Sequence, residues 1–254
     1  MRRLADRVAL VTGAGGPMGR AVAAKVAAEG AHVAIADISA KRLQEGEAEI
    51  ASKAPPGARV VGLRADVTAK AEADALADLA LREFGKVDIL INVVGGIKST
   101  SLYTPFLELP EERWDATFAL NLKPGFHLIK RLAPGMLARR YGKIVNVASV
   151  VLGGEAGQAD YASAKAAVAA LTRSLAEEFA PHVNVNCIAP GLIDTSVVRR
   201  LPEDELRKFV GKSALKRLGR PEEIADVAVW LASDESSFLT GEIIAVSGGN
   251  HPAL

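Results

Sequence analysis

Short runs of apolar residues, rich in valine and isoleucine, recur along the whole chain, and longer alanine-rich segments separate them. Within these runs the apolar residues do not alternate with polar ones, which is typical of strands that are buried on both faces of a parallel sheet. The predicted strands are Val8–Val11, His32–Ala36, Arg59–Leu63, Ile89–Val94, Ile144–Ala148, Val183–Ile188 and Ile243–Val246.

The segments between these runs have the amphipathic pattern of helices. They are Pro17–Glu29, Ser39–Ser52, Ala69–Phe84, Glu111–Arg140, Ala159–Phe179 and Pro221–Ala232. This repetition predicts a doubly wound α/β fold, with a Rossmann-like parallel sheet of about seven strands flanked by helices. No linker rich in proline, glycine or serine divides the chain, so we expect residues 1–254 to form one domain.

Two long connections interrupt the rhythm of strands and helices. They are residues 95–110 and residues 190–220, the second with a small predicted helix near Pro202–Val210. Folds of this type bind ligands at the carboxyl ends of their parallel strands, where long loops collect. Both connections are therefore candidate substrate loops.

Composition and charge narrow the possible partners. The formal net charge is +1, from 31 Lys and Arg against 30 Asp and Glu, so no global field favours nucleic acid or an anionic membrane. No apolar run approaches the ~20 residues of a membrane span. Cys187 is the only cysteine, which excludes an intrachain disulfide and favours a reducing, cytoplasmic setting. The four histidines show no metal-ligand spacing, so we expect no metal site.

A glycine-rich turn follows the first predicted strand, where residues 12–19 read Thr-Gly-Ala-Gly-Gly-Pro-Met-Gly. The glycines at 13, 16 and 19 would let the backbone approach a pyrophosphate, and the N-terminus of the next helix offers free N–H groups. Many tight turns use glycine for conformational reasons alone. The position between strand and helix favours a dinucleotide site.

Asp37 ends the second predicted strand, 18 residues beyond Gly19. An acidic residue at about this distance accepts the ribose 2′-hydroxyl of NAD and repels the 2′-phosphate of NADP. Asp37 could instead cap the next helix, but Ser39 could also do that. No basic residue stands at Gly16 or Ile38 to hold a 2′-phosphate. We therefore expect NAD as the cofactor.

Tyr161 and Lys165 are four residues apart at the start of a predicted helix, so they share a face. An ammonium ~4 Å from a phenol, at an effective dielectric near 20, is worth about 4 kcal/mol, or about three pKa units. That shift would bring the pKa of Tyr161 to ~7, where acid–base catalysis is efficient. Ser149 ends the fifth predicted strand and could bind a carbonyl oxygen. Taken alone, such a pair is more often a surface contact.

Together these residues resemble the short-chain dehydrogenase/reductase family, in its classical length class, over nearly the whole chain. Further motifs of the family match Asp66-Val67, the segment Asn92–Gly95 and Pro190-Gly191. Asn121 falls where the family has a catalytic asparagine, and Thr195 falls where it contacts the nicotinamide carboxamide. Pro17, Val93-Val94 and Ser247 depart from the family pattern. Proline suits a first helical position, although it removes one possible phosphate donor.

The resemblance implies reversible hydride transfer between a secondary alcohol carbon and nicotinamide C4. Tyr161 would exchange the hydroxyl proton, Ser149 would polarise the substrate oxygen, and Lys165 would lower the tyrosine pKa and bind the nicotinamide ribose. Asn121 would hold a water that links Lys165 to solvent. The cofactor contacts implied are Gly13, Gly16, Met18, Gly19, Asp37, Ile38, Asp66, Val67, Asn92, Gly95, Tyr161, Lys165, Pro190, Gly191, Ile193 and Thr195.

The substrate side is apolar in character. The two long connections and the segment between Ser149 and Tyr161 supply candidate contacts, namely Ile97, Val151, Leu152, Gln158 and Leu192. Such a lining suits an apolar ketone or secondary alcohol. Each of these residues could equally pin a loop to the core.

The resemblance also implies an assembly of several copies. Helices matching Glu111–Arg140 and Ala159–Phe179 are the dimer faces of a tetramer in the family, so we expect a homotetramer or a homodimer. Family tails can reach a neighbouring active site, which draws attention to His251.

Three functions are compatible with these residues. The first is an NAD-dependent secondary-alcohol dehydrogenase or ketone reductase acting on small molecules. The second is an NADPH-dependent 3-oxoacyl carrier-protein reductase, with Lys130, Arg131 and Arg173 as a carrier-docking patch; Asp37 argues against it. The third is a non-catalytic NAD-binding regulator or scaffold, which the intact set of four catalytic candidates disfavours.

Overall fold

Seven parallel strands form the central sheet of the computed structural model, which describes residues 2–99, 101–195, 198–200 and 203–250. Their order across the sheet is β3-β2-β1-β4-β5-β6-β7. The strands are β1 (Val8–Thr12), β2 (His32–Asp37), β3 (Val60–Arg64), β4 (Ile89–Asn92), β5 (Gly142–Val147), β6 (Val183–Pro190) and β7 (Ile243–Val246). The chain runs to one edge through β3 and then crosses back to place β4 beside β1. This confirms the Rossmann-like doubly wound fold.

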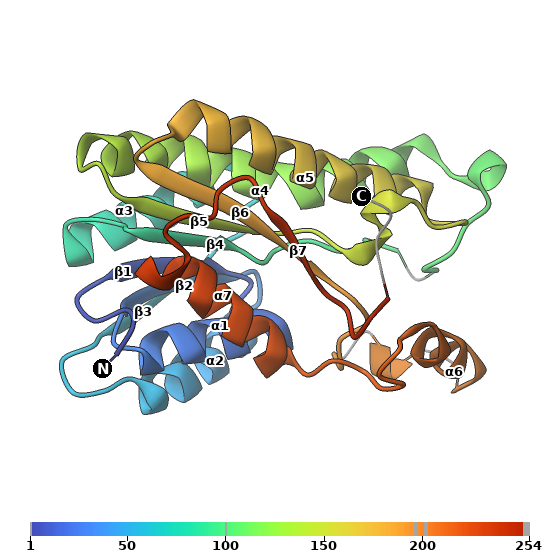
Figure 1. The fold of residues 1–254 in the computed structure, drawn as a ribbon, viewed down its shortest axis with the longest axis horizontal. Coiled ribbons are helices and arrows are strands. Elements are labelled where there is room, and N and C mark those ends of the chain that lie inside the picture. The colour runs from blue at the N-terminus through green and yellow to red at the C-terminus, as the bar shows by residue number, and fades with distance from the viewer. Residues whose placement is uncertain (1, 100, 196–197, 201–202, 251–254) are drawn as a thin grey trace.

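Helices cover both faces of the sheet (Figure 1). On one face lie α1 (Pro17–Ala28), α2 (Ala40–Lys53) and α7 (Pro221–Ala232), and on the other lie α3 (Lys70–Phe84), α4 (Glu111–Ala138) and α5 (Ala159–Phe179). Successive residues of a strand point to opposite faces. Accordingly, Ala9 and Val11 of β1 join the core under α1 and α7, while Val8 and Leu10 join the core under α3 and α4.

The helix and strand boundaries differ from the predicted ones by one or two residues. The expected strand 89–94 is wrong at its end, because β4 stops at Asn92 and the Thr12 hydroxyl then accepts the N–H groups of Val93 and Val94. Ser39 caps α2 by accepting the N–H of Arg42, which leaves the carboxylate of Asp37 available for other contacts.

The two long connections both leave the carboxyl edge of the sheet. The first contains a short 3-10 helix, η1 (Phe106–Glu108). The second contains η3 (Val198–Arg200) and α6 (Glu203–Lys212), and its two arms pair at Ile193 and Gly219. The helix expected near 202–210 is therefore present, although Pro202 lies outside the described residues. In Figure 1, α6 stands apart from the sheet and its layers of helices.

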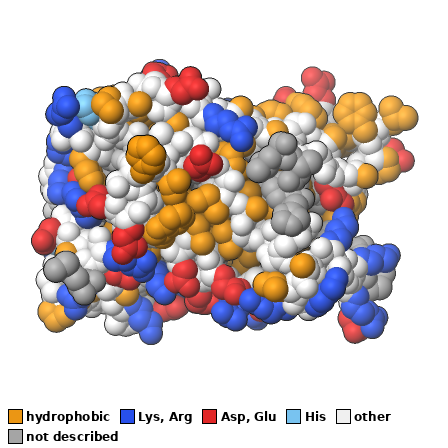
Figure 2. All heavy atoms as spheres, viewed as in Figure 1, with side chains coloured by type: hydrophobic (Ala, Val, Ile, Leu, Met, Phe, Trp, Pro, Cys, Tyr) orange, Lys and Arg blue, Asp and Glu red, His pale blue; other side chains and the backbone are white. Residues whose placement is uncertain are grey.

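The surface mixes both signs of charge. Figure 2 shows basic and acidic side chains interspersed over the face in view, with hydrophobic side chains gathered near its centre. Among the described residues, no helix combines the length and the apolar character needed to cross a membrane.

Candidate active site

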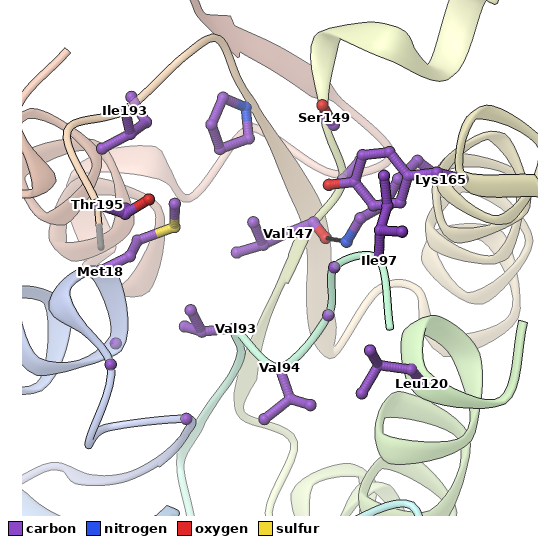
Figure 3. Close-up of a pocket in the computed structure, with 18 of the residues that line it drawn as sticks. Met18, Val93, Val94, Ile97, Leu120, Val147, Ser149, Lys165, Ile193 and Thr195 are labelled. Carbon is purple, nitrogen blue, oxygen red and sulfur yellow. Dashed lines mark hydrogen bonds between the residues drawn. The ribbon is translucent and has the colours of Figure 1, made fainter. Parts of the chain in front are cut away.

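One cavity of about 690 Å³ opens along the carboxyl ends of the strands. Six strands deliver residues to it from the segments at or just beyond their ends: Gly13 after β1, Asp37 of β2, Asp66 after β3, Gly95 after β4, Ser149 after β5 and Pro190 of β6. Met18, Ile193 and Thr195 lie on one side of it, with Ser149 and Lys165 across from them (Figure 3). Residues predicted to bind the cofactor and residues predicted to be catalytic therefore line the same cavity.

The glycine turn packs too closely for side chains. A Cβ on Gly19 would lie 2.2 Å from the carbonyl oxygen of Gly13, and Gly13 itself has φ +69°. Gly16 is the N-cap of α1 and Pro17 its first residue, and no side chain caps this end. The first N–H groups of a helix lack partners within the helix, so this turn can hold a pyrophosphate.

Asp37 is 7% exposed, and three nitrogen donors already bind its carboxylate. The N–H of Gly15 lies 3.2 Å from Oδ2, and the N–H of Ser39 lies 2.8 Å from Oδ1. Nη2 of Arg42 lies 2.8 Å from the same Oδ1, and Arg42 also lines the cavity. Positions 16 and 38 carry no basic residue, as expected from the sequence, but Arg42 brings a cation to this side of the cavity. Arg42 follows Asp37 by five residues, and the start of α2 folds it back onto the carboxylate.

Most of the other predicted cofactor residues line the cavity: Gly13, Gly16, Met18, Gly19, Ile38, Asp66, Val67, Gly95, Pro190, Gly191, Ile193 and Thr195. The Thr68 hydroxyl and backbone donate to Asp66 and hold the pKa of that carboxyl below its usual range. Asn92 does not line the cavity, because its Nδ2 donates to Asn146 Oδ1 inside the sheet. Val93 and Val94 present apolar side chains in its place (Figure 3).

Ser149, Tyr161 and Lys165 meet in the cavity. A hydrogen bond joins the Ser149 and Tyr161 side chains. Lys165 is buried, and its Nζ donates to the Val147 carbonyl at 2.8 Å and lies 5.7 Å from the Tyr161 ring centroid (Figure 3). A Cβ on Gly95 would stand 2.7 Å from this Nζ, so glycine lets the lysine take this position without a shift.

Asn121 lies behind the cavity wall. Its Nδ2 donates to the carbonyls of Thr117 and Gly96 at 2.7 and 2.8 Å, and its Oδ1 accepts the N–H of Gly96 at 3.0 Å. The side chain thus fixes the backbone where the first long connection begins. Asn121 Oδ1 also lies 2.7 Å from the point where a Cβ of Gly95 would stand, as does Lys165 Nζ, so both groups approach the same glycine.

The expected shift of the tyrosine pKa toward 7 is wrong for this structure. Burial raises the pKa of Tyr161 to about 12, and the hydrogen bond from Ser149 only partly opposes this. Burial also lowers the pKa of Lys165 to about 8. The ammonium faces the Val147 carbonyl rather than the phenol oxygen, so desolvation of the phenolate dominates.

On the substrate side, Ile97, Val151, Gln158 and Leu192 line the cavity as predicted. Leu152 does not, because it packs against the apolar cluster around Ala148 and Val168. Leu120, Lys212 and Asn250 also line the cavity, although no local pattern pointed to them. His251 lies outside the described residues. Within the described part, no cluster of three or more His, Cys, Asp or Glu could hold a metal ion.

Comparisons with known proteins find relatives that match nearly the whole chain. A family model described as enoyl-(acyl carrier protein) reductase matches residues 13–251. The chain is 38% identical to a (2S)-[(R)-hydroxy(phenyl)methyl]succinyl-CoA dehydrogenase subunit of Thauera aromatica, over 96% of each chain. It is 37% identical to a 3-oxoacyl-[acyl-carrier-protein] reductase of Thermotoga maritima, over 97% of this chain and 98% of that one.

A solved structure of 7α-hydroxysteroid dehydrogenase, in complex with NADH and 7-oxo glycochenodeoxycholic acid, superposes with a TM-score of 0.90. The sequences are 34% identical, and the alignment covers 99% of this chain and 97% of that one.

Proposed function

Because the chain belongs to the short-chain dehydrogenase/reductase family, we propose that it transfers a hydride reversibly between NAD(H) and a secondary alcohol or ketone of apolar character. The observation that carries the proposal is the meeting of Ser149, Tyr161 and Lys165 in a cavity that continues to the glycine turn. One cavity thus offers a coenzyme cradle and a proton donor.

The residues present fit a nicotinamide dinucleotide. Gly13 and Gly19 leave the turn free of side chains, and the uncapped start of α1 suits a pyrophosphate. Asp37 and Ile38 would hold the adenosine ribose, Asp66 and Val67 the adenine, and Ile193 and Thr195 the nicotinamide end. When bound, the nicotinamide supplies the acceptor or donor of the hydride.

The protein's own groups handle the proton. Ser149 orients the substrate oxygen by a hydrogen bond, and Tyr161 donates its hydroxyl proton to that oxygen in reduction or removes a proton in oxidation. The buried ammonium of Lys165, which donates to the Val147 carbonyl, would bind ribose hydroxyls of the coenzyme. Asn121 fixes the backbone at Gly96 and would support a water that returns protons to Lys165.

Asp37 supports NAD rather than NADP as the preferred coenzyme. Its carboxylate lies in the cavity at the end of β2, where it would accept a ribose 2′-hydroxyl and repel a 2′-phosphate. The related hydroxysteroid dehydrogenase holds NADH in its structure.

A second candidate is an NADPH-dependent 3-oxoacyl carrier-protein reductase. The identity to the Thermotoga maritima reductase favours it, and so does Arg42, a cation at the edge of the cavity. The carrier-docking patch proposed for it would consist of Lys130, Arg131 and Arg173. The burial of Asp37 within the coenzyme end of the cavity argues for the first candidate.

The assembly and setting proposed from the sequence stay part of this proposal. Two long helices, α4 and α5, lie side by side on one face of the sheet and would form the contact between copies in a homotetramer or homodimer (Figure 1). The even balance of charge and the lone cysteine support a cytoplasmic protein that binds neither nucleic acid nor membranes.

The test follows the near-ultraviolet absorbance of reduced nicotinamide. Purified protein is mixed with NAD or NADP and a panel of aliphatic, cyclic, aromatic and 3-hydroxyacyl secondary alcohols. We expect NAD-linked turnover, and Tyr161→Phe should lower kcat/KM by about 100-fold or more, because it removes the acid–base group. Tyr141→Phe is the matched control, since Tyr141 bonds Asp234 away from the cavity and should leave the rate unchanged. NADP-linked turnover of 3-hydroxyacyl thioesters alone would favour the second candidate. Silence with every pair would overturn the proposal.

A further inference from the structure

Arg113 and Asp160 form a buried ion pair between the first turns of α4 and α5. Nε of Arg113 lies 3.0 Å from Oδ2 of Asp160, and the side chains are 9% and 0% exposed. The Thr117 hydroxyl donates to the same Oδ2 at 2.9 Å. Burial alone would raise the pKa of Asp160, but the hydrogen bonds from Arg113 and Thr117 hold it below its usual range. The carboxylate is therefore ionised next to Tyr161.

The same guanidinium also reaches the first long connection. Nη1 of Arg113 donates to Thr104 Oγ1 at 2.6 Å and to the Ser101 carbonyl at 3.2 Å. Leu102 and Tyr103, between these two anchors, line the cavity. Arg113 thus bridges the wall of the cavity and the helix that carries Tyr161.

Local helix energetics do not explain an arginine at this position. A cation in the first turn of a helix interacts unfavourably with the helix dipole and destabilises the helix. The neighbouring Glu111 and Glu112 are anions and stabilise the same turn. The favourable contacts of Arg113 are instead with the connection that precedes α4 and with Asp160, which is 47 residues away. These contacts account for the residue.

The network continues to a second residue of the candidate site. Thr117, which donates to Asp160, accepts Nδ2 of Asn121 through its carbonyl at 2.7 Å. Asn121 in turn binds both backbone groups of Gly96, at the start of the connection. The connection is therefore tied to the catalytic helices at Gly96, through Asn121, and at Thr104, through Arg113.

We propose that Arg113 and Asp160 are positioning residues, which hold the segment 101–104 against the start of α5 so that Leu102 and Tyr103 shape the substrate wall beside Tyr161. This proposal rests on the proposed function for its catalytic consequence. Loosening the tie displaces the substrate wall and leaves the coenzyme end and the proton donor in place. It therefore acts on KM for the ketone more than on kcat or coenzyme affinity.

The test compares Arg113→Met and Thr104→Val with Arg59→Met. Arg59 is a matched control because it also forms an ion pair, with Glu83, away from the cavity. For the ketone that corresponds to the panel alcohol with the highest kcat/KM, both test variants should raise KM about tenfold, the scale of one hydrogen bond to a charged group. Their kcat and their Kd for the coenzyme should stay within about twofold of the control, a change below one hydrogen bond. Thr104→Ser, which keeps the hydroxyl, should restore KM.

A second readout does not depend on turnover. Amide hydrogen exchange of residues 101–109 in the unliganded protein should speed up in both test variants and stay unchanged in Arg59→Met. Thr104→Val removes the shorter of the two contacts between Arg113 and the connection and leaves the Ser101 contact and the buried ion pair in place. It therefore decides the matter if Arg113→Met does not fold. If KM and the exchange rates of residues 101–109 in both test variants equal those of Arg59→Met, the proposal that Arg113 and Asp160 hold the segment 101–104 is wrong. A wild-type protein without turnover would overturn the proposed function instead, and exchange would still test whether Arg113 and Asp160 hold this segment.

Discussion

At the scale of single residues, the acceptor sites of the Asp37 carboxylate determine what that residue can bind at the coenzyme end of the cavity. An ionised carboxylate offers about four acceptor sites. The N–H groups of Gly15 and Ser39 and the guanidinium of Arg42 occupy three of them. One site remains for a ribose hydroxyl, and the cation beside it is 52% exposed. The same pair of side chains thus offers an acceptor for a ribose hydroxyl and keeps a potential partner for a phosphate close by.

Asp37→Asn should narrow the preference for NAD over NADP. The change removes the charge that repels a 2′-phosphate and releases Arg42 to meet that phosphate. We expect the ratio of kcat/KM values to move toward NADP by about tenfold or more, the scale of one charge-assisted hydrogen bond. Initial rates with both coenzymes measure this ratio. Adding Arg42→Met should remove the gain, and an unchanged ratio in the single variant would refute the role of Asp37.

The proton equilibria of Tyr161 and Lys165 predict different pH trends of kcat/KM for the two reaction directions. The pKa of Tyr161 is raised to about 12, so the hydroxyl is protonated near neutrality and ready to donate in ketone reduction. Alcohol oxidation needs the phenolate, whose share grows about tenfold per pH unit below the pKa. We expect kcat/KM for oxidation to climb from pH 7 to 9, while that for reduction does not. Lys165, with its pKa lowered to about 8, loses its charge between pH 7 and 9. We therefore expect kcat/KM for oxidation to rise less steeply above pH 8. Rates in both directions at constant ionic strength test this, and a flat oxidative profile would contradict it.

At the scale of elements, the turn between β1 and α1 is the tightest contact of the coenzyme end. Gly19, in the first turn of the helix, lies directly on the Gly13 carbonyl, and the two residues must stay in contact for the turn to close. Gly16, three residues before it, has φ −83°, and a Cβ there would make only a van der Waals contact, 3.4 Å from the Gly13 carbonyl oxygen. The two glycines of one motif therefore have different physical reasons to be glycine.

Gly19→Ala should destabilise the protein, and Gly16→Ala should not. The new methyl group at 19 would overlap a backbone oxygen, and overpacking of this kind costs about 1–3 kcal/mol or more. For a chain of this size, thermal unfolding should then begin several degrees lower. Differential scanning calorimetry on the unliganded variants measures the two Tm values. Equal Tm values would show that the helix can shift to make room.

The elements of this fold are predictable from the sequence because its strands are buried on both faces. Leu10 and Ile35 are fully buried, and such residues form continuous apolar runs in the sequence. These runs identify the strands. The site residues that belong to motifs were also predictable, since Ser149, Tyr161 and Lys165 line one cavity. The predicted boundary at Val94 failed because a single hydroxyl, that of Thr12, takes over the hydrogen bonds of the strand.

At the scale of the whole molecule, the contributions that the sequence did not reveal come from long-range contacts. Lys212 reaches the cavity only because α6, far from the glycine turn in sequence, folds toward it. Leu152 was expected in the cavity, but the short helix η2 (Val150–Gly153) turns it toward Val168 and away from the substrate. Neither side-chain position follows from the hydrophobic periodicity of the sequence. Periodicity predicts whether a segment is a helix or a strand, whereas these positions depend on where the helix packs.

The packing of α7 on α1 has a consequence for how the chain is made. Val22 and Val26 of α1 join one core cluster with Ile224 and Ala228 of α7, and Lys25 pairs with Asp226 at 2.5 Å. During synthesis on the ribosome, the helix that anchors the glycine turn therefore keeps an uncovered apolar flank until almost the entire chain has emerged. The nascent first half carries every residue of the turn, yet it matures only when α7 arrives to cover that flank.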